Sequence, residues 1–155
     1  MQDIPTPKLE WFADLEVEVG APIEVGRTQH GLRRLIPILG GRANGQGWSA
    51  SVLPGGADHQ AVLTPRLVEL DARYVLRTEE GDCLYVHNRA IRCAAEEVTA
   101  RLLRGEAVPA DQVYFRCTPS FEASAPAWRW ITEQVFLGSG VRTPDRVLMR
   151  FFRVL

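Results

Sequence analysis

The chain has 155 residues, of which 46% are hydrophobic and 24% charged; this length and composition predict one globular domain over residues 1–155. Its 18 basic and 19 acidic residues give a net charge of −1, which argues against nucleic-acid binding because such proteins usually carry a basic excess. No apolar run reaches the roughly 18–20 residues of a membrane span, and the first residues lack the pattern of a signal peptide. We therefore expect a soluble, cytoplasmic domain that binds neither nucleic acid nor membrane.

Reactive and metal-binding motifs are scarce. Cys83, Cys93 and Cys117 are an odd number without CxxC spacing, so free thiols are expected rather than a disulfide framework or a zinc site. The three histidines show no metal-binding spacing, and no GxSxG, Walker or GxGxxG motif occurs. The sequence predicts no metal and no cofactor.

Turns rich in glycine and proline cut the chain into short runs, as in an all-β sandwich or barrel. In chain order, strands are predicted over 15–19, 35–39, 48–53, 67–78, 83–89, 113–118, 130–137 and 146–154. The glycine-rich turn at 44–47 joins the second and third of these. Pro37 cannot donate to a strand ladder, so its strand is expected at an edge or at a bulge.

One segment has the pattern of a helix instead. Glu96 and Glu97 stand early in it, Arg101 stands late, and Gly105 follows, which is the charge and capping pattern of a helix. We predict one short helix near 95–104. The whole chain is predicted to be all-β, a calycin-like, closed antiparallel barrel of eight to ten strands.

Three predicted strands separate apolar from polar side chains by alternation, so each offers two different faces. The apolar faces carry Leu70, Ala72, Tyr74 and Leu76, then Leu84, Val86 and Asn88, then Val113, Phe115 and Cys117. The polar faces carry Asp71, Arg73, Tyr85, His87, Arg89, Tyr114 and Arg116.

Two interpretations of the polar faces remain open. They are solvated, as in many antiparallel sheets, or they line a ligand cavity inside a barrel. Repeated tyrosine and arginine, rather than lysine, glutamate and serine, favour the cavity. In that case the apolar faces lie outside and need cover, which predicts a homodimer or a higher symmetric oligomer.

The chain resembles a known family through ordered blocks from about residue 9 to 154. These blocks are Gly40-Gly41, Pro54-Gly55-Gly56-Ala57-Asp58 with Gln60, Leu70-Asp71-Ala72-Arg73-Tyr74, Leu84-Tyr85-Val86-His87-Asn88-Arg89 with Arg92, 114–122 and Gly140-Val141-Arg142. Together they resemble the family called domain of unknown function 3237. The resemblance implies a closed or nearly closed barrel with an internal pocket, self-association and small organic substrates, but no established activity.

The resemblance and the alternation together select the candidate site residues. The candidates for catalysis are Asp71, Asp58, Tyr85 and Tyr114. The candidates for substrate binding are Arg73, Asn88, Arg89, Arg116, Glu122, Gln60 and Trp130. We expect six of them to converge on one cavity, namely Asp71, Arg73, Tyr85, Arg89, Tyr114 and Arg116.

Two functions fit these residues. The first is a cofactor-independent enzyme that performs acid–base chemistry on an oxygenated or aromatic metabolite, as an isomerase, cyclase or lactone hydrolase would. In it, Asp71 or Asp58 is a desolvated general base and arginines stabilise an oxyanion. The second is a barrel that binds such a molecule without catalysis. A third interpretation makes every Asp–Arg pair a scaffold salt bridge.

Overall fold

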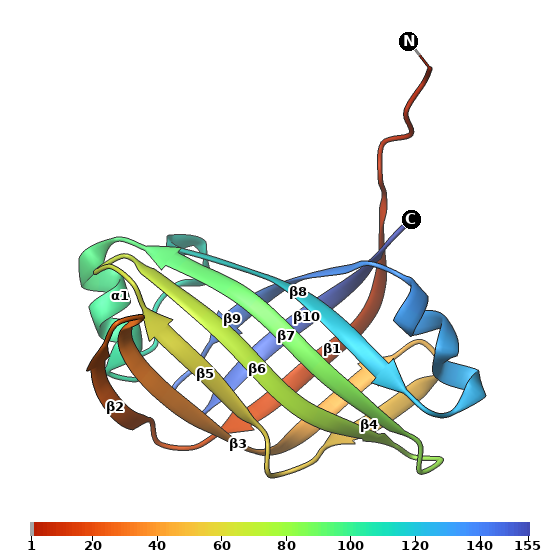
Figure 1. The fold of residues 1–155 in the computed structure, drawn as a ribbon, viewed down its shortest axis with the longest axis horizontal. Coiled ribbons are helices and arrows are strands. Elements are labelled where there is room, and N and C mark those ends of the chain that lie inside the picture. Colours follow the sequence, from red (N-terminus) through yellow and green to blue (C-terminus); the bar gives the residue numbers. More distant parts are fainter. Residues whose placement is uncertain (1) are drawn as a thin grey trace.

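The short apolar and alternating runs of the chain form strands that close into a barrel (Figure 1). The computed structural model describes residues 2–155. Its strands are β1 (Leu9–Val19), β2 (Ile23–Thr28), β3 (Gly31–Gly45), β4 (Trp48–Val52), β5 (Ala57–Val62), β6 (Leu67–Thr78), β7 (Cys83–Ala94), β8 (Val113–Ala123), β9 (Phe136–Arg142) and β10 (Arg146–Val154). Its helices are α1 (Glu96–Leu103) and two 3-10 helices, η1 (Ala110–Gln112) and η2 (Pro126–Glu133).

Within the described residues, eight strands form the antiparallel ring in the order β1-β10-β9-β8-β7-β6-β4-β3, which β1 closes by pairing with β3. The other two strands extend it: β5 pairs with β3 and β6, and β2 pairs with β3. Each end of the barrel carries a helix, α1 at one end and η2 at the other (Figure 1). The predicted all-β antiparallel barrel is confirmed.

The long strand β3 changes partners along its length. Residues 31–35 pair with β2, whereas residues 38–45 pair with β1. Pro37 lies between these two pairings, where its missing N–H interrupts neither ladder. Gly41 follows in the left-handed region of φ, which favours glycine.

Most predicted elements are confirmed, and one is wrong. The predicted helix near 95–104 is α1, and the strands predicted at 67–78 and 146–154 are β6 and β10. Residues 130–137 do not form one strand, because η2 continues to Glu133 and β9 begins only at Phe136. Pro126 stands in the first turn of η2, where its fixed φ suits a helix. The buried Ile131 anchors η2 to the core.

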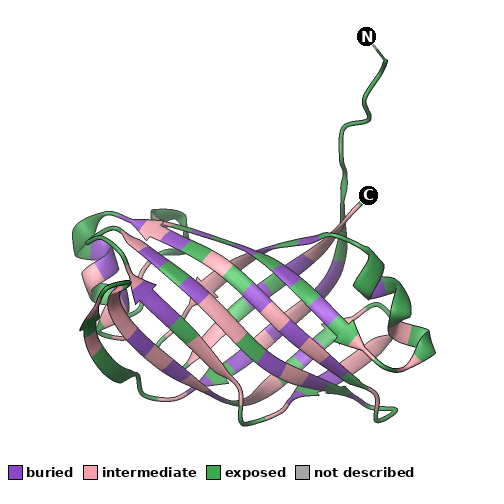
Figure 2. Ribbon diagram, viewed as in Figure 1, coloured by how far each residue is buried: buried purple, intermediate pink, exposed green. Residues whose placement is uncertain are grey.

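The interior is filled by the apolar side of each strand, and burial alternates along the strands (Figure 2). Towards η2 the core is aromatic: the ring of Phe12 packs on Trp48, Phe121, Trp130 and Phe136 at centroid distances of 4.9–5.7 Å. Trp128 lies edge-on against Trp48 at 5.0 Å. This aromatic plug fills the end of the barrel that η2 covers.

No helix within residues 2–155 has both the length and the hydropathy to span a membrane.

Replacing Gly56 with alanine should destabilise the barrel. An added Cβ would stand 2.5 Å from the carbonyl oxygen of Arg73 and 2.6 Å from Cβ of Tyr74, and a backbone atom cannot turn away. We expect Gly56→Ala to cost about 1–3 kcal/mol of unfolding free energy, the usual cost of overpacking. Urea denaturation measures it. Gly40→Ala is the control, since its nearest neighbour is Oε2 of Glu18 at 3.7 Å; equal losses would contradict the steric argument.

Candidate functional site

The polar faces predicted to line a cavity lie on the outside of the barrel. On β6 the inward side chains are Val68, Leu70, Tyr74 and Leu76, which are all buried. On the same strand Asp71 and Arg73 keep 39% and 52% of their side-chain surface exposed. The predicted orientation of these faces is therefore wrong. A closed barrel of this size has an interior filled by side chains, and the apolar faces take that place because their burial is favourable.

The six residues expected to converge form surface contacts instead. Nε2 of His87 lies 2.7 Å from Oδ1 of Asp71, and Nε of Arg73 lies 3.4 Å from the same oxygen. The guanidinium of Arg116 lies over the ring of Tyr114, 5.1 Å from its centroid. Asp71, Arg89, Tyr114 and Arg116 border one open depression on the outer wall. They share a face, as predicted, but it is the outer one.

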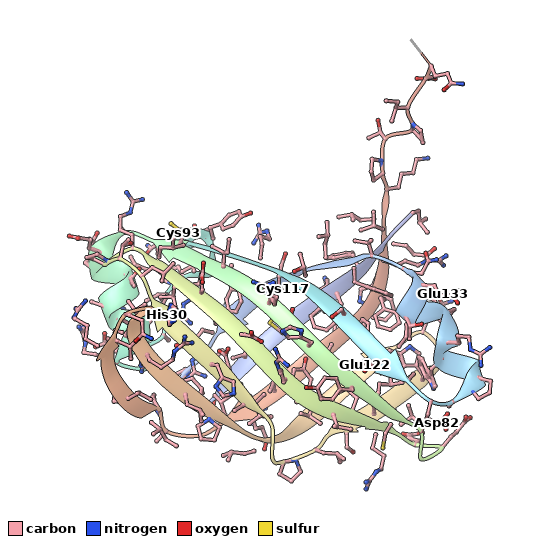
Figure 3. All side chains as sticks on the ribbon, viewed as in Figure 1. His30, Asp82, Cys93, Cys117, Glu122 and Glu133 are labelled. Carbon is pink, nitrogen blue, oxygen red and sulfur yellow. The ribbon has the colours of Figure 1, made fainter. Side chains whose placement is uncertain are left out.

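The remaining outward candidates lie apart from one another. Figure 3 labels Glu122, which lies nearer the end that η2 covers than Cys117, a buried residue of the same strand. Glu122 is exposed on β8, opposite Tyr85 in the register with β7. Trp130 lies in η2, with the guanidinium of Arg153 5.3 Å from its ring. Neither Glu122 nor Trp130 lines the interior cavity described next.

The interior holds a small, mostly apolar cavity that a few polar side chains also line. It measures about 50 Å³, and its polar lining comes from β5, β6, β7 and β9. These side chains are Asp58, Gln60, Tyr74, Asn88, Arg92 and Arg142. Asp58, Gln60 and Asn88 were predicted as site residues, and the structure brings these three together.

Strand register explains how this space arises. Asp58 pairs with Ala72, and Ala72 pairs with Asn88, so the three residues form one row across β5, β6 and β7. Strands lie about 4.8 Å apart, so Asp58 and Asn88 are roughly 10 Å apart at the backbone. The methyl group of Ala72 leaves most of the gap between them unfilled. Ala90, two residues along β7 from Asn88, lines the same cavity.

Asp58 is held by hydrogen bonds rather than by a salt bridge within residues 2–155. Its Oδ2 accepts from Nε2 of Gln60 at 2.9 Å, and its Oδ1 accepts from the backbone N–H of Asp71 at 3.1 Å. Loss of hydration raises the pKa of Asp58 above the ordinary 3.8, although Gln60 and the charge of Arg92 oppose the shift. A carboxyl with a raised pKa can accept and return a proton nearer to neutral pH.

Two arginines, Arg92 and Arg142, line the same cavity as this carboxyl, and Arg34 lies near both of them. The pKa of Arg92 is lowered to about 10, mainly by burial, which Asp58 opposes and the charges of Arg142 and Arg34 reinforce. Arg142 also has a lowered pKa, first from burial and then from the charge of Arg34. Arg34 is buried on β3, where its Nε pairs with Oε1 of Glu24 at 2.8 Å. Positive charge is therefore concentrated at this end of the interior.

Four buried polar atoms on this cavity lack a hydrogen-bond partner among residues 2–155. They are Oε1 of Gln60, the hydroxyl oxygen of Tyr74, Oδ1 of Asn88 and Nε of Arg92. Each of these residues is at most 6% exposed. A buried polar atom without a partner costs about 1–3 kcal/mol, so four such atoms in one place require an explanation, and a functional role is one that fits.

A second, partly open space lies next to this cavity, beneath α1. It measures about 320 Å³ and is bordered by the end of α1 at Leu102 and Leu103. It shares Val19, Ile36, Gln60, Arg92 and Arg142 with the inner cavity. N–H groups of Arg34 reach the carbonyl oxygen of Leu103 at 3.0 Å, which fastens α1 over this mouth.

Polar residues on the apolar faces of the strands indicated the inner site in the sequence, but the prediction followed the opposite, polar faces instead. Asn88 and Arg92 interrupt the apolar alternation of β7, where their neighbours on the same face are Val86 and Ala90. A polar residue on an otherwise apolar face must find a partner in the interior. Tyr74 was assigned to an apolar face, and Arg34 carried no local signal. Within residues 2–155, no three His, Cys, Asp or Glu side chains gather to hold a metal ion.

Sequence comparison identifies the family. The family described as "Protein of unknown function (DUF3237)" matches residues 7–154. The chain belongs to this family. The UPF0311 protein RPA1785 of Rhodopseudomonas palustris is 38% identical over 151 residues, which cover 97% of this chain and 99% of that protein. The family suspected from the ordered blocks is confirmed.

Several solved structures share the barrel. The crystal structure of RPA1785 matches with a TM-score of 0.92 and 37% identity, covering 98% of this chain and all of the other. A β-barrel like protein of Acinetobacter baumannii matches with a TM-score of 0.84 and 30% identity over the full length of both chains. A structure described as an enzyme from Penicillium herquei has a TM-score of 0.73 and 16% identity over both full lengths; it shows the fold alone.

Self-association remains a prediction. It was based on apolar strand faces that lie outside and need cover, whereas these faces fill the core. The outer wall still exposes large apolar side chains, among them Ile91, Tyr114 and Leu137.

The stability of the protein should depend on pH through Asp58. Because its pKa is raised in the folded state, protonated Asp58 contributes stability that is full below about 3.8 and is lost as the pH rises through the folded pKa. The Asp58→Asn protein lacks this loss, so it should gain stability relative to wild type as the pH rises. Urea unfolding from acid to neutral pH measures the difference.

Asp14→Asn is the control of opposite sign. The hydrogen bond from Arg150 lowers the pKa of Asp14, so its contribution is present above 3.8 and is lost as the pH falls through the folded pKa. The stability of wild type relative to Asp14→Asn should therefore increase as the pH rises. If the unfolding free energies of wild type and Asp58→Asn changed in parallel with pH, the pKa of Asp58 would not be raised in the folded state.

Proposed function

We propose that the protein is a cofactor-independent enzyme that moves a proton on a small oxygenated molecule bound in the barrel, with Asp58 as the general acid and base. The observation that carries this proposal is the group of four partnerless polar atoms around one desolvated carboxyl. Pockets with convergent polar groups and a shifted pKa are the usual location of catalysis.

Asp58 would accept the proton. Each of its oxygens accepts one hydrogen bond from the protein and retains a further lone pair. With substrate above it, ionised Asp58 would remove a proton from a carbon next to a carbonyl group or from a hydroxyl. The electron pair released from a C–H bond would move to the carbonyl oxygen. The same carboxyl could return the proton to another atom of the substrate.

Arginine and tyrosine would stabilise the intermediate. The N–H of Arg92 Nε is buried, lacks a partner within residues 2–155 and can donate to an enolate or alkoxide oxygen. Burial raises the pKa of Tyr74, so its phenol stays protonated in the neutral range and can donate a hydrogen bond to that oxygen. No oxidant or reductant is required, because the atoms of substrate and product are the same.

The enzymatic description of the Penicillium herquei structure agrees with this proposal, although the similarity to it extends only to the fold. A barrel that binds the same molecule without catalysis would use the same polar atoms. The pKa of Asp58 favours the enzyme, because a binding site alone gains nothing from a carboxyl that is desolvated and free of a salt bridge within residues 2–155.

Deuterium exchange tests the proposal without a known substrate. Wild-type protein is incubated in deuterated water with small carbonyl acids, lactones and phenols, and mass spectrometry follows deuterium uptake and isomerisation. We expect Asp58→Asn to lower the rate by about 10²–10⁴-fold, the usual contribution of general acid–base catalysis. Its melting temperature is measured alongside, to separate loss of chemistry from loss of fold.

Asp71→Asn is the matched comparison, since it changes the other predicted base, which lies on the outer wall. It should keep its rate. Equal rates in wild type and Asp58→Asn would overturn the proposal. Binding of a compound by wild type without any exchange or conversion would identify a carrier instead.

A further inference from the structure

The two amide side chains of the cavity present their oxygens to a ligand. Gln60 donates its Nε2 to Asp58 at 2.9 Å, which fixes its Oε1 as the free atom. The side chain of Asn88 lowers the pKa of the Cys117 thiol, although burial raises it to about 12 overall. Oδ1 of Asn88 is buried and has no hydrogen-bond partner among residues 2–155. Both free atoms are acceptors, so they require a donor.

The arginines define the charge of that ligand. Arg34 is paired with Glu24, whereas Arg92 and Arg142 form no salt bridge within residues 2–155. The charge of Arg142 lowers the pKa of Arg92, and the charge of Arg34 lowers the pKa of both; Asp58, and Asp145 beside Arg142, offset this only in part. A cationic donor such as an ammonium group would be repelled here. The donor that the amides need is therefore a hydroxyl, and the arginines suit a carboxylate.

The sizes of the two spaces define how the ligand lies. The inner cavity of about 50 Å³ exceeds the roughly 30 Å³ share of one water molecule by little, so it accepts a hydroxyl group but not a ring. The mouth of about 320 Å³ can hold the body of a small molecule. Arg92 and Arg142 line both spaces and so stand at their junction.

We propose that the site binds a small hydroxy acid whose hydroxyl and carboxylate lie at the same end of the molecule. The carboxylate binds Arg92 and Arg142, the hydroxyl enters the inner cavity and donates to Gln60 Oε1 or Asn88 Oδ1, and the remainder lies in the mouth beneath α1. This substrate class rests on the function proposed above, because it places the carbon that bears the hydroxyl close to Asp58.

Matched ligands test the proposal by calorimetry and saturation-transfer NMR on the full chain. Mandelate and salicylate are compared with their methyl esters, which lack the charge, and with phenylacetate and benzoate, which lack the hydroxyl. At least one hydroxy acid should bind, and its ester and its deoxy analogue should each bind about tenfold more weakly or worse, as expected for losing a hydrogen bond to a buried or charged group.

Variants assign the binding to this site. Arg142→Gln should lower the affinity for the hydroxy acid by about 10- to 100-fold, the range for a charge-assisted contact. It should leave the affinity for the ester unchanged. Arg92→Lys is the second variant, in case the first does not fold, and should weaken the acid because lysine lacks the fork. Arg150→Gln is the control; this exposed arginine pairs with Asp14 on the outer wall and should leave binding unchanged.

The outcomes separate this proposal from the catalytic one. Binding of the esters as tight as that of the acids, or no binding of either acid at millimolar concentration, would overturn the hydroxy-acid proposal. If neutral compounds exchange deuterium through Asp58 while the acids do not bind, the catalytic proposal stands and this one fails. If the acids bind through Arg142 without any exchange, this proposal stands and catalysis by Asp58 fails.

Discussion

Closure of the strand ring is the constraint on which the rest of the structure depends. Because β1 pairs with both β10 and β3, each ring strand has one face turned towards a space that the wall separates from water. Apolar side chains fill that space by the hydrophobic effect, and a polar side chain can remain there only with a partner. The inward polar residues are therefore informative, since nothing in the packing of a barrel requires them.

Alternation was enough to predict the strands, but not to decide which of their faces turns inward. The run from Leu67 to Thr78 shows its period of two in the sequence, and β6 has these bounds. The outward choice for Leu70 and Tyr74 came from treating Arg and Tyr as pocket residues. The total free energy of burying the apolar faces of all ring strands in one interior decides which face of each strand turns inward. The sequence of a single strand does not reveal this total.

Two errors in the predicted secondary structure, the missed strand β5 and the false strand at 130–137, also have physical causes. β5 begins directly after Gly55 and Gly56, which predict a turn locally, and its place is set by pairing with β3 and β6 rather than by its own residues. Residues 130–133 have the apolar character of a strand, but Pro126 starts a 3-10 helix that packs Ile131 into the core. In the candidate site, Asp58, Gln60 and Asn88 could be predicted from ordered blocks, whereas the path of β3 brings Arg34 to the second space beneath α1.

The two ends of the interior divide stability from function. Towards η2, the rings around Phe12 pack against one another and bury large apolar surfaces, which is the main source of stability in such a core. Towards α1, Asp58 and the arginines are desolvated, and their partnerless neighbours oppose folding. The two groups lie mostly on different strands, because the aromatic rings come from β1, β4, β8, β9 and η2, whereas Asp58, Ala72 and Asn88 lie on β5, β6 and β7. The register of these three neighbouring strands places Ala72 between Asp58 and Asn88, and the outer ion pairs, being exposed, contribute little to stability.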